Sequence, residues 1–232
     1  MTIIQINDLR FHWKGQTNDT LSIEQMNIKN GEHVLLRGES GSGKTTLLNL
    51  LAGILTPSAG KIALLGKNLE ALKPAKRDRF RADHMGIIFQ QFNLLPYLSV
   101  IDNVTLPCQF SSRRNKKAGD QKQTALRLLN HLGLDQTLCH RSVSELSVGQ
   151  QQRVAAARAL IGQPEIIIAD EPTSSLDTNK RDDFLNLLFQ EANTQNSTII
   201  FVSHDPAISD HFPKIIELSD INRVRPLHKS MT

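Results

Sequence analysis

The sequence predicts an α/β fold built on a mostly parallel β-sheet, with an antiparallel β flank and an inserted α-helical subdomain. The first observation is a set of short apolar runs separated by segments long enough to form helices, which is typical of a parallel sheet covered by helices on both faces. These runs are residues 34–36, 166–169, 197–202 and 214–218. Because parallel strands end at one edge of their sheet, we expect polar and catalytic residues to gather at the carboxyl ends of these runs.

The flank and the insertion rest on two further observations. Residues 3–6 and 21–28 alternate apolar and polar side chains on either side of a polar turn at 15–18, which indicates antiparallel strands. Farther along the chain the strand signals fade, and apolar residues recur at helical spacing over 116–132 and 149–160. This middle stretch is therefore expected to form a mainly helical insertion on the sheet core.

The expected organisation is a single domain over residues 1–232, a length that suits one domain with an inserted subdomain. The core with its β flank would span about 1–85 and 159–225, and the helical subdomain would span about 86–158. The tail after Arg223 is too short to fold alone, and we expect it to be loose.

Composition narrows the class of protein. Hydrophobic residues make up 39% and charged residues 22% of the chain, and no apolar run approaches the roughly 18 residues that would cross a bilayer. Residues 1–8 alternate in polarity like a strand, so no secretory signal is expected. Cys108 and Cys139 lack the spacing of metal ligands, and we expect them to be reduced and structural.

The basic charge of the chain has two interpretations. A net charge of +4 with a pI near 9.2 would suit a nucleic acid or an anionic membrane surface as partner. However, the one dense basic run lies in a polar stretch without interleaved aromatic residues, which is more typical of a solvated loop. This run comprises Arg113, Arg114, Lys116 and Lys117. We expect no nucleic-acid partner.

Residues 38–45 follow the pattern GxxxxGK[ST] between an apolar strand and a helical segment, the context that a phosphate-binding loop requires. Its glycines let backbone N–H groups turn toward nucleotide phosphates at the positive end of the following helix. We expect Lys44 to reach the β and γ phosphates and Thr45 to offer its hydroxyl to Mg²⁺. The expected nucleotide-binding residues here are Gly38, Glu39, Ser40, Gly41, Ser42, Gly43, Lys44, Thr45 and Thr46. The motif predicts a P-loop NTPase core, and the alternative of a plain glycine-rich turn leaves the Lys-Thr pair unexplained.

Three further polar residues end predicted strands. Asp170 follows an apolar run, so its carboxylate is expected beside the phosphate loop, where it would hold Mg²⁺ through water. Glu171 comes one residue later and is a candidate general base, although it could also be a surface acid that opens the turn before Pro172. His204 ends the next run and could contact the γ phosphate, although a lone histidine is more often structural.

Taken in order, these residues resemble the ATP-binding cassette ATPases, and the resemblance covers nearly the whole chain. Trp13 stands where that family has an aromatic residue that stacks on adenine. Gln90 stands where it has a glutamine that touches Mg²⁺ and senses the transporter. Residues 146–150 (Leu-Ser-Val-Gly-Gln) resemble the family signature, and residues 174–177 resemble the loop that crosses a dimer interface.

This resemblance implies the chemistry and the roles of the residues that carry it. The core would be RecA-like, with ATP and Mg²⁺ as cofactors and hydrolysis of ATP to ADP and phosphate as the reaction. Glu171, His204, Lys44 and Gln90 would be the catalytic residues, with His204 as the switch histidine. Thr45, Gln90 and Asp170 would lie around the metal.

The resemblance also implies a head-to-tail homodimer, in which Ser147 and Gly149 cap the γ phosphate bound by the opposite subunit. Gln150 and Asp177 would also contact this nucleotide. Val148 departs from the family, which usually has glycine there, and a β-branched residue fits only if φ stays negative. We therefore expect slower or retuned hydrolysis and not a dead site. Ser175 replaces a common alanine, which is a mild change.

Within the family, residues 80–86, 92–96 and 102–104 most resemble the group that includes MacB, LolD and FtsE. This implies an integral membrane permease-type subunit as partner and, through it, a periplasmic adaptor. The chain would lie peripherally on the cytoplasmic face of the inner membrane and drive efflux, lipoprotein release or mechanotransmission. One alternative is a non-transporting regulatory ATPase that gates a cell-envelope process such as division. Another is a DNA-repair or translation ATPase, which would need long coiled coils or two cassettes in one chain.

Overall fold

The computed structural model describes residues 1–174 and 176–224. The expectations for Ser175 and for residues 225–232 of the tail fall outside the described residues.

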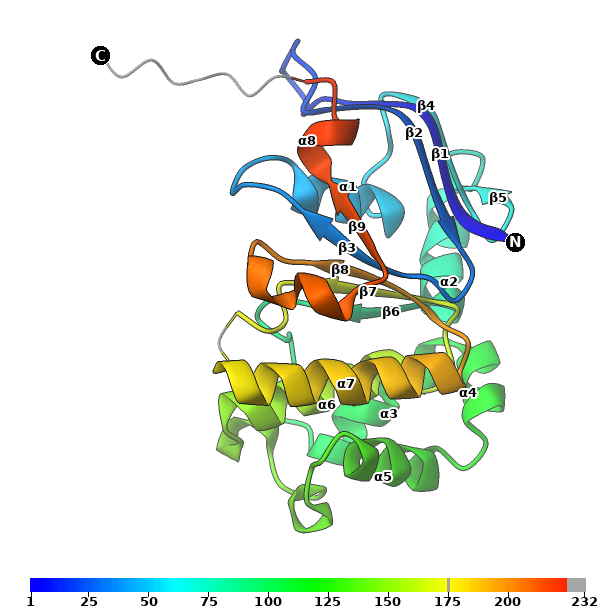
Figure 1. Ribbon diagram of the computed structural model, residues 1–232. Coiled ribbons are helices and arrows are strands. Elements are labelled where there is room, and N and C mark those ends of the chain that lie inside the picture. The colour runs from blue at the N-terminus through cyan, green and yellow to red at the C-terminus, as the bar shows by residue number, and fades with distance from the viewer. Residues whose placement is uncertain (175, 225–232) are drawn as a thin grey trace.

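The centre of the molecule is a five-stranded parallel sheet in the order β6-β7-β8-β3-β9 (Figure 1). Its strands are β3 (His33–Arg37), β6 (Met85–Ile88), β7 (Ile166–Asp170), β8 (Thr198–Val202) and β9 (Lys214–Glu217). The four apolar runs of the sequence are four of these strands, which confirms the predicted parallel sheet. Three of the adjacent strands, β7, β8 and β3, therefore deliver their carboxyl ends side by side.

The antiparallel flank is a second sheet in the order β2-β1-β4-β5. Its strands are β1 (Thr2–Phe11), β2 (Leu21–Lys29), β4 (Ala59–Leu64) and β5 (Lys67–Asn68). The pairing of β1 with β2 confirms the antiparallel expectation, whereas β4 and β5 had no counterpart in the sequence prediction. In Figure 1 this sheet lies on one side of the parallel sheet together with α1, and α3, α5, α6 and α7 lie on the other side.

The helices are distributed as an α/β fold requires. Their bounds are α1 (Lys44–Leu51), α2 (Pro74–His84), α3 (Val100–Phe110), α4 (Ser112–Ala118), α5 (Gln121–His131), α6 (Val148–Leu160), α7 (Thr178–Thr194) and α8 (Leu218–Ile221). Short 3₁₀ helices are η1 (Gln136–Leu138), η2 (Val143–Glu145) and η3 (Pro206–His211). Over the described residues, no helix is long and apolar enough to cross a membrane.

The stretch with helical spacing over residues 116–132 lies in two helices, because the chain breaks at Gly119, whose φ of 62° ends α4. Asp120 then caps α5, with its side chain accepting a hydrogen bond from the Gln123 N–H. One detail differs from the sequence expectations: residues 86–88 were expected to begin the helical subdomain and instead lie in β6 of the parallel sheet.

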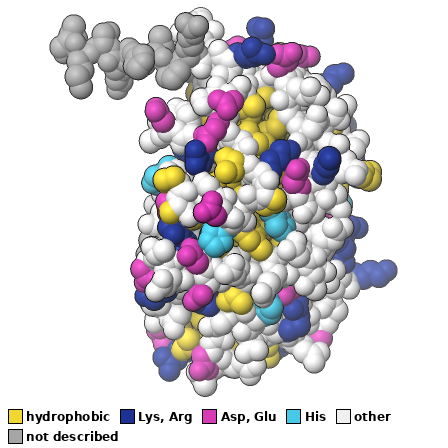
Figure 2. Space-filling view, in the orientation of Figure 1, with side chains coloured by type: hydrophobic (Ala, Val, Ile, Leu, Met, Phe, Trp, Pro, Cys, Tyr) yellow, Lys and Arg dark blue, Asp and Glu magenta, His cyan; other side chains and the backbone are white. Residues whose placement is uncertain are grey.

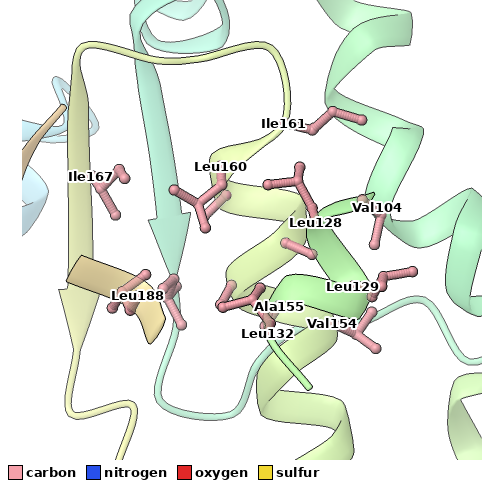
Figure 3. Packing of buried hydrophobic residues seen from close by; sticks show 14 of the residues in the cluster. Val104, Leu128, Leu129, Leu132, Val154, Ala155, Leu160, Ile161, Ile167 and Leu188 are labelled. Carbon is pink, nitrogen blue, oxygen red and sulfur yellow. The ribbon is translucent and has the colours of Figure 1, made fainter. Parts of the chain in front are cut away.

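The core consists of two apolar clusters, one on each face of the parallel sheet. Strand residues alternate between the faces, so Val34 and Leu36 belong to one cluster and Leu35 to the other. Figure 3 shows the cluster that contains Leu35, to which Leu128 of α5, Ala155 of α6 and Leu188 of α7 all contribute. The buried helix α6 therefore connects the helical subdomain to the sheet.

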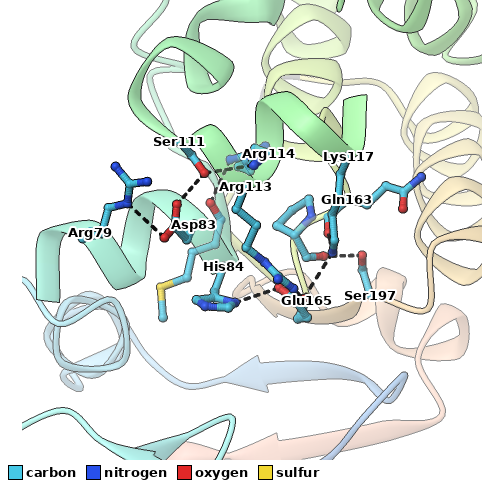
Figure 4. Close-up of polar contacts among 12 residues, drawn as sticks. Arg79, Asp83, His84, Ser111, Arg113, Arg114, Lys117, Gln163, Glu165 and Ser197 are labelled. Carbon is cyan, nitrogen blue, oxygen red and sulfur yellow. Dashed lines mark hydrogen bonds and ion pairs between the residues drawn. The ribbon is translucent and has the colours of Figure 1, made fainter. Parts of the chain in front are cut away.

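Polar contacts attach α4 to the sheet core (Figure 4). The buried Arg114 guanidinium donates to the carbonyl oxygens of Met85 at 3.0 Å and of Ala159 and Ile161 at 2.8 Å. Burial lowers its pKa to about 10. These bonds satisfy carbonyl groups at the C-terminal end of α6 and fix that end to β6.

Glu165, just before β7, is surrounded by basic side chains from two helices, His84 from α2 and Arg113 and Lys117 from α4. Burial opposes its ionisation, but hydrogen bonds from His84 and Arg113, together with Lys117, lower its pKa to about 2. His84 Nδ1 and Lys117 Nζ lie 3.0 and 3.2 Å from its carboxylate oxygens. This cluster ties α2 and α4 to the start of the same strand that ends at Asp170.

Candidate functional site

The loop between β3 and α1 ends at a residue whose backbone conformation favours glycine, Gly43. Gly43 is the N-cap of α1 with a left-handed φ of 104°, and a Cβ there would lie 2.9 Å from Leu21 Cδ2. Gly41 has a φ of 78°. The loop thus delivers the N-terminus of an eight-residue helix, with its free N–H groups, to the carboxyl edge of the sheet.

Lys44 is the first residue of α1, and its side chain folds back over the loop. It is only 7% exposed, and its Nζ donates to the carbonyl oxygens of Gly38 at 2.7 Å and Glu39 at 2.8 Å. The ammonium group is therefore held over the loop that was predicted to bind phosphate. A mobile surface lysine would lack these two hydrogen bonds. The fixed position of the Lys44 ammonium group therefore supports a preformed anion-binding site.

Thr45 and Asp170 meet beside this loop. The Thr45 hydroxyl lies close enough to the Asp170 carboxylate to influence its pKa, although Thr45 lies on α1 and Asp170 at the end of β7. Burial, followed by the nearby Glu171, raises the Asp170 pKa, while Lys44 and Thr45 act in the opposite direction. A hydroxyl beside a half-buried carboxylate is a pair of hard oxygen ligands, which fits Mg²⁺.

Glu171 directly follows β7 and has a left-handed φ of 43°. Such a conformation costs a non-glycine residue roughly 1–3 kcal/mol and persists where the surroundings hold it. Here the Glu171 N–H donates to the Val202 carbonyl at 3.0 Å, so the end of β8 holds it. The chain therefore leaves the extended strand conformation at Glu171, directly after Asp170.

His204 follows β8, the neighbour of β7 in the sheet. Its Nδ1 lies 3.0 Å from Glu171 Oε1, with the imidazole largely exposed and the carboxylate mostly covered. Ser203, between β8 and His204, lies close to β3, and its N–H is 3.4 Å from the Leu36 carbonyl. The structure thus brings together Lys44, Thr45, Asp170, Glu171 and His204 at the ends of three adjacent strands.

An open cleft of about 1460 Å³ adjoins the phosphate loop. Its walls are residues 15–20 of the β1–β2 connection, part of the phosphate loop, His204, Pro206 and the C-terminal segment from 217 to 224. Hydrophobic side chains are visible in the upper half of the face seen in Figure 2, and basic and acidic side chains are interspersed over this face. The cleft exceeds the roughly 300–1,000 Å³ that is typical of small-molecule sites, so it has room for a nucleotide.

Two walls of this cleft, residues 15–20 and the C-terminal segment 217–224, were missed by the sequence reasoning. The C-terminal segment is held against β2, with the Ser22 N–H donating to Asn222 Oδ1 at 2.8 Å and Asn222 Nδ2 donating to the Thr20 carbonyl at 3.2 Å. Nothing in the local pattern around Asn222 indicates this pairing, because its partners are 200 positions or more away in the chain. Only the folded chain brings the two ends together.

Trp13 does not line the cleft. It is 43% exposed and lies edge-on to Phe11, with ring centroids 5.2 Å apart and planes at 84°. The segment that immediately follows it, residues 15–20, does line the cleft. Trp13 therefore lies two residues before the segment that lines the cleft and is not part of the lining.

The segment that resembles the signature forms the N-terminus of α6. The Ser147 side chain accepts from the Gln150 N–H at 3.4 Å, and the Gln150 side chain accepts from the Ser147 N–H at 2.9 Å, which is a capping box. Val148 is the first helical residue, has no positive φ and is 51% exposed. Position 148 therefore keeps the negative φ that a β-branched residue requires.

The other predicted residues also lie away from the cleft of this single chain. Ser147, Gly149 and Gln150 do not line it, and neither do Gln90, which is exposed after β6, and Asp177. Asp177 is the N-cap of α7, accepting a hydrogen bond from the Lys180 N–H at 3.0 Å. A Cβ at Gly149 would lie 3.7 Å from Leu176 Cδ2, so these two segments are neighbours.

The arrangement can bind a phosphate chain and activate water. A helix N-terminus and a buried ammonium group attract anionic oxygens, and an oxygen pair fits a divalent cation. A carboxylate 3.0 Å from an imidazole could accept a proton from water while the imidazole orients it.

Comparisons with known proteins agree with this chemistry. A family model described as ABC transporter matches residues 21–174. The macrolide export ATP-binding/permease protein MacB of Hyphomonas neptunium is 39% identical over 225 residues, covering 94% of this chain and 33% of that protein. The uncharacterised ABC transporter ATP-binding protein YbbA of Escherichia coli K12 is 39% identical over 207 residues, covering 88% and 89% of the two chains. This chain thus spans about a third of the length of the MacB relatives it matches.

Solved structures with a similar fold include the dimeric ATP-binding cassette MJ0796 in a post-hydrolysis state with ADP and Pi. Its TM-score is 0.82 at 33% identity, covering 93% of this chain and 94% of that one. The cbiO1 protein of Clostridium perfringens, part of the transporter complex cbiONQ, has a TM-score of 0.81 at 28% identity over 93% of this chain and 84% of that chain.

Proposed function

The chain belongs to the ABC transporter family, whose cassettes bind and hydrolyse ATP, and we propose that it is the ATPase subunit that drives a separate integral membrane subunit. The observation that carries this proposal is the placement of Glu171 and His204 beside the phosphate loop of Lys44. A nucleotide-binding protein that only sensed ATP would need the loop but no carboxylate positioned to activate water.

ATP binding begins at the loop of residues 38–45. Free N–H groups of the loop and of the first turn of α1 would donate to the β and γ phosphate oxygens. Lys44 Nζ, now bonded to the carbonyls of Gly38 and Glu39, would exchange part of these contacts for phosphate oxygens. Thr45 and Asp170 would hold Mg²⁺, which when bound offsets charge between the β and γ phosphates.

Hydrolysis follows from the residues at the strand ends. The Glu171 carboxylate would accept a proton from the attacking water as its oxygen approaches the γ phosphorus. The His204 imidazole, 3.0 Å from that carboxylate, would orient the water and donate to a γ phosphate oxygen. Lys44 would stabilise the charge that shifts toward the leaving β phosphate.

We infer that two copies assemble head to tail around two nucleotides. The structural relative MJ0796 is dimeric with ADP and Pi bound. In this chain the signature segment lies outside its own cleft, and the capping box leaves an ordered helix N-terminus with an exposed face. Ser147 and Gly149 of one copy would then close over the γ phosphate held by the other, with Gln150, Asp177 and Gln90 as further contributors.

The membrane subunit would contact the segment after Gln90. Tyr97 in this segment is 79% exposed, and the buried Asn103 fixes the backbone around it by bonding to the N–H and carbonyl of Leu95 at 2.8 and 3.0 Å. An aromatic residue on a fixed loop suits a protein partner. The chain would lie on the cytoplasmic face of the inner membrane, serving efflux, lipoprotein release or mechanotransmission, and a periplasmic adaptor would join through the membrane subunit.

Two measurements test this proposal. Purified chain with Mg²⁺ should release phosphate from ATP, and Lys44→Ala should lose ATP binding in a filter or calorimetric assay. Isolation of the chain from detergent-solubilised membranes should recover a stoichiometric integral membrane protein. A wild-type chain that binds ATP without releasing phosphate, alone or with that membrane protein, would contradict the assignment of an ATPase.

A further inference from the structure

We propose that Arg181 is a positioning residue for His204: it fixes the loop that carries the imidazole to the first turn of α7. This inference rests on the proposed function, in which His204 contacts the γ phosphate. Arg181 itself lines no part of the cleft.

The central contact is a short ion pair between two elements. Arg181 is only 8% exposed, and its Nη1 donates to Asp205 Oδ2 at 2.6 Å. Asp205 is the residue after His204, so the pair acts one peptide bond from the imidazole. A mostly buried guanidinium keeps its position better than an exposed one, because neighbouring atoms exclude its other rotamers.

Asp205 transmits this constraint to its own backbone. Its Oδ1 accepts from the Ala207 N–H at 2.9 Å and caps η3, and its N–H donates to Ser203 Oγ at 3.0 Å. The residues on both sides of His204 are therefore held by one side chain network. If Asp205 moved, the capped turn and the imidazole would move with it.

A second contact ties the far end of η3 to the same turn of α7. His211 Nε2 lies 3.2 Å from Asp182 Oδ1, and Arg181 Nε donates to the same oxygen at 3.3 Å. On the opposite side, Arg37 Nη1 of β3 donates to Ser209 Oγ at 2.9 Å. The segment 205–211 is thus fixed at its start, middle and end.

The turn of α7 that supplies Arg181 begins at Asp177. The Arg181 N–H donates to the Asp177 carbonyl at 2.9 Å, and Leu176, just before it, is the neighbour of Gly149. The structure therefore contains a continuous set of contacts from the signature segment through Asp177 and Arg181 to the His204 loop. A shift of the α7 N-terminus on dimer closure would reposition the imidazole relative to Glu171.

The first test measures position without ATP turnover. Imidazole resonances of His204 are recorded by NMR in the full-length chain for Arg181→Ala and Arg181→Lys, and assigned with His204→Gln. We expect Arg181→Ala to shift and broaden these resonances and Arg181→Lys to restore them largely. The His84 resonances, in the separate Glu165 cluster, should not move. Unchanged His204 resonances in a folded Arg181→Ala protein would overturn the proposal.

The second test separates positioning from binding. Arg181→Ala should lower kcat roughly 10-fold with KM within about 2-fold, since a misplaced group costs rate and not ground-state binding. Asp205→Asn keeps the cap of η3 but loses the charge, and it should give a similar loss. The double variant should be no slower than the slower single variant, because both changes break one contact. Asp183→Asn, exposed on the same helix, is the matched control and should behave as wild type.

The NMR and kinetic tests distinguish failure of the Arg181 proposal from failure of the proposed function. If the wild-type chain hydrolyses no ATP, the proposed function fails, and the NMR arm still decides whether Arg181 holds His204. If Arg181→Ala does not fold, Asp205→Asn decides in both assays. Additive rate losses in the double variant would show that the two residues act independently and would overturn the proposal.

Discussion

His204 Nδ1 and Glu171 Oε1 lie 3.0 Å apart, although the two residues follow different strands. The contact follows from the sheet order, because β7 and β8 are parallel neighbours and Asp170 is in register with Val202. A base and a water-orienting group are therefore placed together by the pairing of two strands.

Glu171→Gln should keep ATP affinity and lower turnover by roughly 10² to 10⁴ fold, because the amide cannot accept a proton from water. The same variant should accumulate as an ATP-bound dimer, visible by sedimentation. His204→Asp, as a companion, should lose turnover without loss of the fold. A Glu171→Gln protein that stays monomeric with saturating ATP and Mg²⁺ would argue against this base or against the dimer mechanism.

Trp13 should change its fluorescence when ATP binds. It is the only tryptophan, and the segment that follows it lines the cleft, so stacking on adenine or ordering of residues 15–20 would alter its surroundings. The measurement is an emission titration with ATP, using Lys44→Ala as the non-binding control. An identical spectrum at saturating ATP would leave Trp13 as a packing partner of Phe11.

Val148→Gly should raise the ATPase activity of the assembled complex a few fold. Within one chain Val148 is exposed and helical, so any crowding must arise against the nucleotide of the opposite subunit. Ser147→Arg should abolish activity by blocking closure. Rates are compared in the same reconstituted complex, with melting temperatures as control. Equal or lower activity of the glycine variant would mean that Val148 is simply accommodated.

Glu165→Gln should destabilise the protein most near neutral pH and less at pH 3, where part of the stabilisation by Glu165 is already lost. The folded-state pKa of Glu165 is lowered to about 2 from an ordinary 4.5, so its stabilisation is present above about pH 4.5 and is lost as pH falls through 2. The shift corresponds to at most about 3 kcal/mol. Urea unfolding at pH 7 and pH 3 measures the difference between wild type and variant. A difference that grew in acid would contradict the role of His84, Arg113 and Lys117 in holding this carboxylate.

The elements that the sequence alone determined are local ones. The phosphate loop could be recognised because left-handed glycines, a lysine and a helix start all lie within residues 38–45, and the parallel strands because continuous apolar runs mark fully buried strands. The candidate residues Asp170, Glu171 and His204 could be identified by their position at strand ends. Trp13 was identified by resemblance alone, and it does not line the cleft.

The tertiary structure alone decided what depends on contacts between distant segments. The order β6-β7-β8-β3-β9 sets which strand ends adjoin, and no local pattern carries that order, because pairing energies belong to two segments at once. The cleft wall around Asn222 and the contact of Arg181 with Asp205 arise in the same way. Local backbone preferences depend on residues that are close in sequence, so the sequence reveals them. Contacts between distant residues form only when the whole core packs, so the tertiary structure is needed to identify them.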